Sequence, residues 1–255
     1  MNLTDDDILK FQRGTPILLD DICAIHNHTI GEIIDIGYDK FQQYLNVILM
    51  HKPVIKDKTP IAEVIQSLTD FQYLLMLVET DIQMRDLVKE AFYFFLQDDV
   101  TFSLEPAQII VGPLSEKHFL DEGKFYDLQK IVRHMYFIDL DKDDIIIDPN
   151  DSPAVRALKE KMRENREKLQ KAKAKKAAQS KNELKFSDLV GSVALVCGLQ
   201  NTWNMTYYFF NDQLKRMGWR EQFDINNRAA MAGAKLKKSQ LKHWIRSIDS
   251  VDNKS

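Results

Sequence analysis

Three consecutive residues, His26, Asn27 and His28, spell a nuclease motif and raise metal-dependent cleavage of nucleic acid as a first hypothesis. The nuclease motif spreads its histidines over a ββα-metal unit, whereas these residues are contiguous and stand directly before a helix cap at Thr29. We therefore interpret them as loop residues without a catalytic role. The other histidines have no partner at a metal-ligand spacing such as HxxxH with a glutamate: His51, His118, His134 and His243.

A second candidate for chemistry is the acidic run DLDKDDIIIDPN at residues 139–150. Acidic residues occupy its first, third and fifth positions, as in a calcium-binding loop. The sixth position is Asp144 instead of the glycine that permits the sharp turn, and the twelfth is Asn150 instead of a bidentate glutamate. We interpret the run as an acidic turn. Because the sequence also has no glycine-rich phosphate loop and no GxSxG motif, we expect no enzyme, no metal and no cofactor.

The composition is that of a packed soluble protein, with 255 residues of which 44% are hydrophobic and 29% are charged. No apolar run approaches the roughly 20 residues that cross a bilayer, and the opening MNLTDDDILK is acidic where a signal peptide would be basic. Cys23 and Cys197 stand far apart, which favours two free buried thiols over a disulfide. These features predict a cytosolic protein.

Charge divides the chain into two unlike parts. Residues 1–155 carry 13 Lys and Arg against 28 Asp and Glu, a net charge of −15. Residues 156–255 carry 22 against 10, a net charge of +12. This asymmetry indicates either different partners for the two parts or attraction between them.

The elements that must position any site are mainly helical in the first part. Thr29 and Glu32 form a capping box, and the apolar residues after it follow at three- and four-residue steps, which indicates one face of a helix. Those residues are Ile34, Tyr38, Phe41, Leu45 and Ile48. Thr59 before Pro60 begins another helix, with a break near Ser67.

A further capping box is expected at Thr80 and Gln83, before a helix whose buried stripe consists of Met84, Val88, Ala91 and Phe95. VTFSLEPAQIIVG then predicts a hairpin around Glu105 and Pro106, and KFYDLQKIVRHMYF returns to helical spacing. A last strand is expected at residues 143–151. The fold class is therefore mostly α, with an α+β N-terminal domain over residues 1–151 that contains a small β-hairpin.

Residues 152–183 are rich in Lys, Ala and Glu and predict a linker helix that starts at Ser152 and Pro153. A thin heptad seam leaves a coiled-coil dimer as the alternative to a solvated helix. Residues 184–248 form a small basic helical domain, and residues 249–255 a disordered tail. In that domain Ser187 is expected to cap a central helix that is hydrophobic nearly all round. Gly218 is expected to end a second helix, and a third and fourth helix to follow.

Aromatic residues dominate this C-terminal domain. Trp203, Tyr207 and Phe210 are expected on one buried helix face, with Tyr208 on the opposite side as a contact residue. The expected protein-binding residues are Trp203, Tyr207, Tyr208, Trp219, Phe223 and Trp244. Between residues 201 and 248 there are nine Lys and Arg against three Asp and Glu, so a DNA-binding regulator that uses these helices is the alternative function.

The stretches WNMTYYFFNDQLKRMGWREQFDINNRAAMAGAK and KLKKSQLKHWIRSI resemble those of tail assembly chaperones of long-tailed bacteriophages. TIGEIIDIGYDKFQQYL is similar to the start of such proteins. The resemblance implies a non-virion protein of the host cytoplasm that coats the tape measure protein, keeps it soluble and recruits tail tube subunits. It also implies self-association in multiple copies, no membrane partner, and in many members a shorter form made by frameshifting.

Overall fold

The computed structural model describes residues 4–53, 55, 59–113, 118–138, 152, 154–155, 157–159, 161–162, 168, 184–237 and 243–245. The mostly helical fold with an α+β N-terminal part is confirmed. The acidic run 139–150, the strand expected at residues 143–151 and the tail 249–255 lie outside the described residues. So do most of the linker 152–183 and of the fourth C-terminal helix at residues 239–248.

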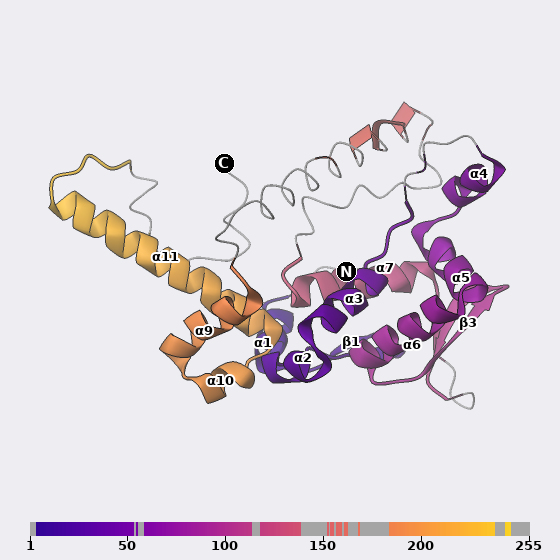
Figure 1. Cartoon of the computed structure of the whole chain (residues 1–255), viewed down its shortest axis with the longest axis horizontal. Coiled ribbons are helices and arrows are strands. Elements are labelled where there is room, and N and C mark those ends of the chain that lie inside the picture. Colours follow the sequence, from indigo (N-terminus) through magenta and orange to yellow (C-terminus); the bar gives the residue numbers. More distant parts are fainter. Residues whose placement is uncertain are drawn as a thin grey trace.

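The N-terminal part packs seven helices around two small antiparallel sheets, counted over the described residues (Figure 1). The first sheet pairs β1 with β2, and the second has the order β3-β4-β5. The elements are α1 (Asp5–Arg13), β1 (Ile17–Leu19), β2 (Cys23–Ile25), α2 (Ile30–Ile36), α3 (Tyr38–Ile48), α4 (Pro60–Ser67), α5 (Asp70–Thr80), α6 (Ile82–Leu96), β3 (Val100–Leu104), β4 (Ala107–Val111), β5 (His118–Leu120) and α7 (Glu122–Met135).

The predicted hairpin and several predicted helix starts are confirmed. Leu104 pairs with Ala107, so Glu105 and Pro106 form a two-residue loop between β3 and β4. The Thr29 hydroxyl accepts from the Glu32 amide at 3.2 Å, and the Glu32 carboxylate accepts from the Thr29 amide at 2.7 Å. α4 begins at Pro60 behind its Thr59 cap, and the chain breaks after Ser67 as expected.

Two predictions about helix boundaries in this part are wrong. The continuous helix expected from Ile34 to Ile48 is divided into α2 and α3 at Gly37, whose φ of 92° is left-handed. The apolar register therefore does not continue across Gly37, and Ile34 is exposed. The capping box at Thr80 is replaced by Asp81, whose carboxylate accepts from the amides of Gln83 and Met84, because aspartate is itself a strong N-cap.

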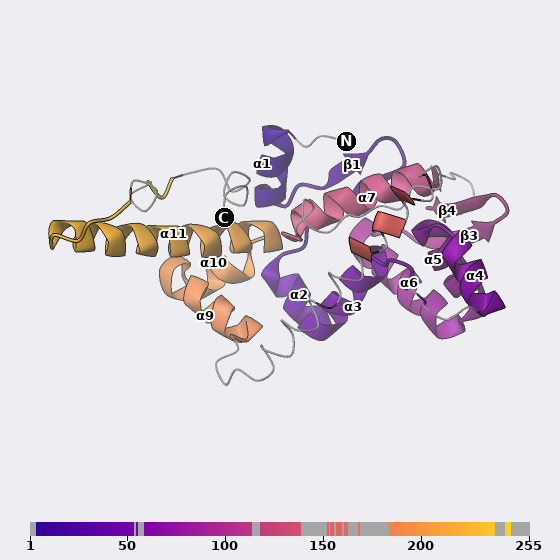
Figure 2. The same cartoon turned by 90° about the horizontal axis from the view of Figure 1, so that it is seen from above.

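The C-terminal part consists of α9 (Phe186–Cys197), α10 (Leu199–Trp203) and α11 (Tyr207–Met231). α11 runs straight through Gly218, so the second and third expected helices are one helix. A glycine inside a helix costs only about 1 kcal/mol, and a long run of good helix formers outweighs that cost. Ser187 is not the cap of α9, because the helix already begins at Phe186, with Lys185 in the N-cap position. In the views of Figures 1 and 2, α11 projects from one end of the molecule and α4 lies at the other.

α9 is not the central helix that its composition suggested. Only Val190 and Val193 are buried along it, where they pack with Ile30 and Phe210. Leu195 and Val196 are exposed on the other side. The helix packs against α10, α11, Ile30 of α2 and, through Phe186, Tyr38 of α3, whereas Leu195 and Val196 remain exposed among the described residues.

The start of α11 is docked on the N-terminal part of the chain. The Thr206 hydroxyl donates to the Phe11 carbonyl at 2.9 Å, and the Tyr207 amide donates to the His28 carbonyl at 2.9 Å. The Tyr208 ring lies 4.6 Å from that of Phe137 and 5.4 Å from that of Phe11, measured between centroids. Tyr208 is therefore a core residue, and its expected place on the solvent side is wrong.

The corrected arrangement of the aromatic residues follows from where α11 begins. Because α11 starts only at Tyr207, Trp203 belongs to α10 and does not continue a face of α11. Phe210 is buried as expected, whereas Trp203 and Tyr207 are half-buried. The first turn of α11 packs against α9 and against the N-terminal part, with Tyr208 and Phe210 buried and Tyr207 and Phe209 half-buried.

The stretch from His26 to His28 is a structural junction, in agreement with its interpretation as loop residues. The His26 amide donates to the Phe95 carbonyl at 2.8 Å, and the Asn27 side chain donates to the Phe11 carbonyl at 2.6 Å. The His28 ring donates from Nε2 to the Phe94 carbonyl at 2.6 Å and stacks on the Phe94 ring. The loop of residues 26–28, which also receives the start of α11, is thus joined to α1 and α6.

We predict that Tyr208→Ala lowers the free energy of unfolding by roughly 3–5 kcal/mol, because a large buried aromatic side chain leaves a cavity. Tyr93→Ala is the matched control, since Tyr93 is 57% exposed and its loss should change stability by about 0.5 kcal/mol at most. Urea unfolding monitored by circular dichroism measures both. Equal stability of the two variants would contradict the core position of Tyr208.

We also predict that the protein loses stability as the pH falls below about 6.5, the ordinary pKa of histidine. Burial lowers the pKa of His28 in the folded protein, although the Phe94 carbonyl and Glu32 oppose this effect. The unfolded chain then binds a proton that folded His28 does not, so acid favours unfolding. Urea midpoints at pH 7.5 and 5.5 should differ less in His28→Gln than in the parent protein, with His26→Gln in between. A pH difference unchanged by His28→Gln would refute this assignment.

Candidate protein-interaction surfaces

The first candidate surface is the corner between α9 and α10. Three large aliphatic side chains are exposed there: Leu195 is 89% exposed, Val196 64% and Leu199 57%. Leu195 and Val196 lie near the end of α9, and Leu199 begins α10 beyond Gly198, whose φ of 84° separates the two helices, so the three side chains flank one turn of the chain. We call Leu195, Val196 and Leu199 the α9–α10 stripe.

The sequence around this stripe explains why it is uniformly apolar. No charged residue occurs between Asp188 and Asp212, so residues 189–211 form an uncharged stretch. On one side of α9, Val190 and Val193 pack against Ile30 and Phe210. On the other side, Leu195 and Val196 are equally apolar but remain in contact with solvent. Exposed apolar residues that cluster without charges mark interaction sites more often than single ones do.

The second candidate surface lies on α4, at the other end of the molecule (Figure 1). Ile61 and Val64 are 72% and 57% exposed, and Ile65 and Leu68 are half-buried. Their spacing of i, i+3, i+4 and i+7 places them on one face of α4. Ala62 is the one buried residue of this helix. We call Ile61, Val64, Ile65 and Leu68 the α4 stripe.

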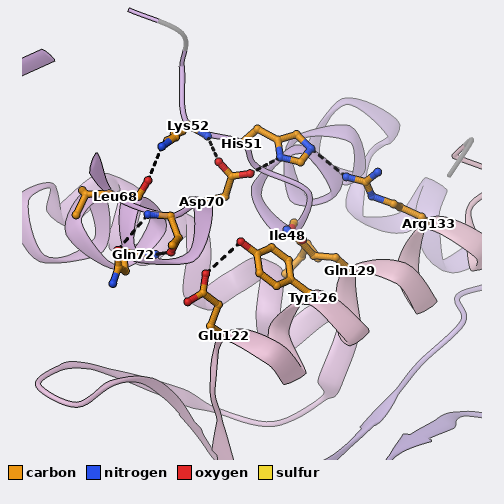
Figure 3. A network of polar contacts seen from close by, with 11 residues as sticks. Ile48, His51, Lys52, Leu68, Asp70, Gln72, Glu122, Tyr126, Gln129 and Arg133 are labelled. Carbon is orange, nitrogen blue, oxygen red and sulfur yellow. Dashed lines mark hydrogen bonds and ion pairs between the residues drawn. The ribbon is translucent and has the colours of Figure 1, made fainter. Parts of the chain in front are cut away.

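A network of polar contacts holds α4 in place (Figure 3). The Lys52 ammonium donates to the Gln66 carbonyl at 2.6 Å and to the Leu68 carbonyl, both at the C-terminal end of α4. A cation at this end is favourable because the last carbonyls of a helix carry partial negative charge. The Lys52 amide also donates to the Asp70 carboxylate at 2.9 Å, which joins α4 to the start of α5.

His51 extends the same network to α7 (Figure 3). Its Nδ1 lies 2.7 Å from an Asp70 carboxylate oxygen, and its Nε2 lies 3.0 Å from Nη2 of the buried Arg133. Because arginine only donates, Nε2 accepts in this arrangement and Nδ1–H donates to Asp70. Gln129 adds a bond from α7 to the Ile48 carbonyl at 2.8 Å. Both ring nitrogens of His51 are thus engaged, which suits a structural tie and leaves no lone pair for a substrate proton.

The expected binding residues do not gather into one exposed patch. Tyr208 is buried, and Trp203, Tyr207, Trp219, Phe223 and Trp244 are half-buried. Tyr207 packs among Phe41, Tyr136 and Phe186, and its burial raises the pKa of its hydroxyl. Phe223 and Trp244 each contact the His243 ring. The residues of the two exposed stripes are aliphatic, and their signal in the sequence was the uncharged stretch 189–211 together with the spacing within α4.

Two of the basic residues of α11 have partners within the described part of the chain. Arg216 pairs with the buried Asp212 at 2.9 Å, and the Lys215 ammonium lies 4.6 Å above the Phe137 ring. Arg220 and Arg228 are exposed further along the helix. In the same described residues, no group of three potential metal ligands lies together, and no helix is long and apolar enough to cross a membrane.

The comparison with known families points to a phage protein. Residues 174–249 match the family model described as the YomV second domain, a match that covers less than a third of the chain. It contains α9, α10 and α11, and therefore the α9–α10 stripe. Among curated proteins and among solved structures, no match was found.

We predict that Lys52→Met loosens α4 while the rest of the fold stays intact, because the last carbonyls of α4 lose their cationic partner. Hydrogen exchange followed by mass spectrometry should show faster exchange over residues 60–68 and unchanged exchange over α6. Lys89→Met, a change of the same kind at an exposed position of α6, is the control. Unchanged exchange in α4 would contradict an anchoring role of Lys52.

Proposed function

We propose that this protein is a phage tail assembly chaperone that acts by binding and performs no covalent chemistry. It keeps the tape measure protein soluble and recruits tail tube subunits. The observation that carries the proposal is the α9–α10 stripe, three exposed aliphatic residues within an uncharged stretch of the region that matches a phage-linked family.

The physical demands of this function agree with such a surface. A tape measure protein exposes long apolar helical faces before tube subunits surround it, and such faces aggregate unless they are covered. A chaperone must cover them through contacts that are individually weak, so that polymerisation of the tube can displace it. The i, i+3, i+4 and i+7 spacing of the α4 stripe suits packing against another helix, and the α9–α10 stripe offers three exposed aliphatic side chains at a turn between two helices.

The two stripes provide a separate site for each of two partners. They lie on different parts of the molecule, the α4 stripe on the acidic N-terminal part and the α9–α10 stripe on the basic C-terminal part (Figures 1 and 2). We assign the tape measure protein to the α4 stripe and the tail tube protein to the α9–α10 stripe. A chaperone with two such surfaces brings tube subunits to the tape measure that it holds.

The experiment measures binding of the purified protein to a tape measure segment, to the tube protein and to random duplex DNA. An aspartate in place of an exposed aliphatic residue should weaken the matching complex by roughly 10- to 150-fold, which corresponds to the 1.5–3 kcal/mol of one buried aliphatic side chain. Leu195→Asp should affect the tube protein, and Ile61→Asp the tape measure segment. Leu18→Asp is the control, because Leu18 is 68% exposed and lies outside both stripes.

A second readout of the same experiment uses the two free cysteines. Cys197 is half-buried at the end of α9, beside the stripe, whereas Cys23 is buried. Burial raises the pKa of the Cys23 thiol to about 12, so Cys23 reacts slowly and serves as an internal reference. Bound tube protein should slow alkylation of Cys197. Tight binding of duplex DNA without binding of either tail protein would overturn the proposal in favour of a DNA-binding regulator.

A further inference from the structure

Residues 205–210, which we call the docking segment, enter the N-terminal part of the chain as a bound peptide would. The Ile30 amide donates to the Met205 carbonyl at 2.8 Å, and the Tyr207 amide donates to the His28 carbonyl at 2.9 Å. These bonds flank an isolated antiparallel bridge between Thr29 and Thr206. Main-chain pairing of this kind is how many proteins bind extended peptides.

The receiving surface, which we call the docking site, consists of Phe11, Gly14 and residues 28–31. The Thr206 hydroxyl donates to the Phe11 carbonyl and accepts from the Phe209 amide at 3.1 Å. Two glycines permit the close approach. A Cβ atom on Gly14 would lie 3.1 Å from the Thr206 methyl carbon, and one on Gly31 would lie 3.2 Å from the Trp203 carbonyl oxygen. A larger residue at Gly14 would push Thr206 of the segment away, and one at Gly31 would push away the end of α10 that leads into the segment.

Each of the two cores contains one buried residue that the other part of the chain supplies. Tyr208 belongs to the large core of the N-terminal part, whose other buried residues all precede position 139. Ile30, which has no exposed surface, belongs to the small core that Val190, Val193 and Phe210 form. The docking segment and its site therefore stabilise each other reciprocally, and neither core is complete without the contact.

The covalent connection does not determine which copy of the chain supplies the segment. Residues 139–183 separate the two parts, and a connection of 45 residues has a maximum reach of about 150 Å. A tether of this length gives its own segment an effective concentration on the order of millimolar at most. Neighbouring copies that are gathered on one surface can reach similar local concentrations.

We propose that the docking segment of one copy fills the docking site of another, so that copies of this protein join through exchanged C-terminal parts. The contacts in such a pair are the same as those within one chain, so exchange costs little beyond association. Because the segment and the site are different surfaces, the contact is head-to-tail, and further copies can extend it into an open string. This inference does not depend on the proposed function. Only the idea that such a string of copies coats a tape measure protein would depend on it.

A complementation experiment with full-length protein tests the exchange. Thr206→Asp damages the segment, because its carboxylate faces the Phe11 carbonyl while its oxygen still caps α11. Gly31→Val damages the site, because its branches meet the Trp203 carbonyl while α2 tolerates valine. Neither variant can dock within its own chain. A mixture of the two contains one intact site and one intact segment for each pair of chains.

We expect each variant alone to sediment as a monomer with parent-like helical circular dichroism, and the mixture to form a one-to-one heterodimer. A mixture that stays monomeric while both variants are folded would overturn the proposal. If either variant loses its helical circular dichroism, the exchange is tested with the parent protein instead. Two differently tagged parent chains are partly unfolded together in urea at high concentration, refolded and diluted. Co-purification of the tags supports exchange, and its absence overturns it. No tail protein is present, so the result is separate from the test of the proposed function.

Discussion

The first turn of α11 is the contact on which the arrangement of the whole molecule depends. Its cap residue, Thr206, satisfies the Phe209 amide and at the same time donates to the Phe11 carbonyl, so one hydroxyl both starts a helix and joins two parts of the chain. Asn27 donates to the same Phe11 carbonyl, which brings α1, the 26–28 loop and α11 to one point. The direction in which α11 projects, and with it the position of α9 and α10, follows from this junction (Figure 2).

Buried polar groups make this junction specific. A buried backbone group without a hydrogen bond costs free energy comparable to a lost bond, and here the carbonyls of Phe11, Phe94 and His28 are each satisfied by a residue distant in sequence. Apolar packing of Tyr208 and Ile30 adds stability but would tolerate several orientations. The hydrogen bonds therefore select one docked geometry, and the packing supplies most of the energy.

Several local signals in the sequence predicted local structure correctly, whereas the expected cap at Thr80 and the expected helix end at Gly218 were wrong for local reasons. Tertiary contacts account for the misplaced aromatic residues and for the exposure of α9. The box at Thr29 and Glu32, the Thr59–Pro60 start and the Glu105–Pro106 turn each involve residues that interact within a few positions, so the sequence contains all that determines them. The burial of Tyr208 depends on Phe11 and Phe137, and no helical periodicity contains that information. Apolar composition likewise predicted a buried α9, whereas exposure of Leu195 depends on which elements are near it. Of the candidate surfaces, only the presence of apolar residues could be predicted, and their exposure could not.

The exposed stripes and the docked junction represent opposite uses of the same kind of residue. At the junction, apolar side chains are combined with main-chain hydrogen bonds, which gives one fixed partner geometry. At the α9–α10 stripe, exposed aliphatic side chains stand near the end of α9 and at the start of α10, so the contact they offer is apolar and undemanding in geometry. Such contacts bind partners of varied sequence weakly and release them easily. The chaperone function that we propose would use both: a precise junction that keeps the parts of the chain together, and an imprecise surface for a partner that must leave.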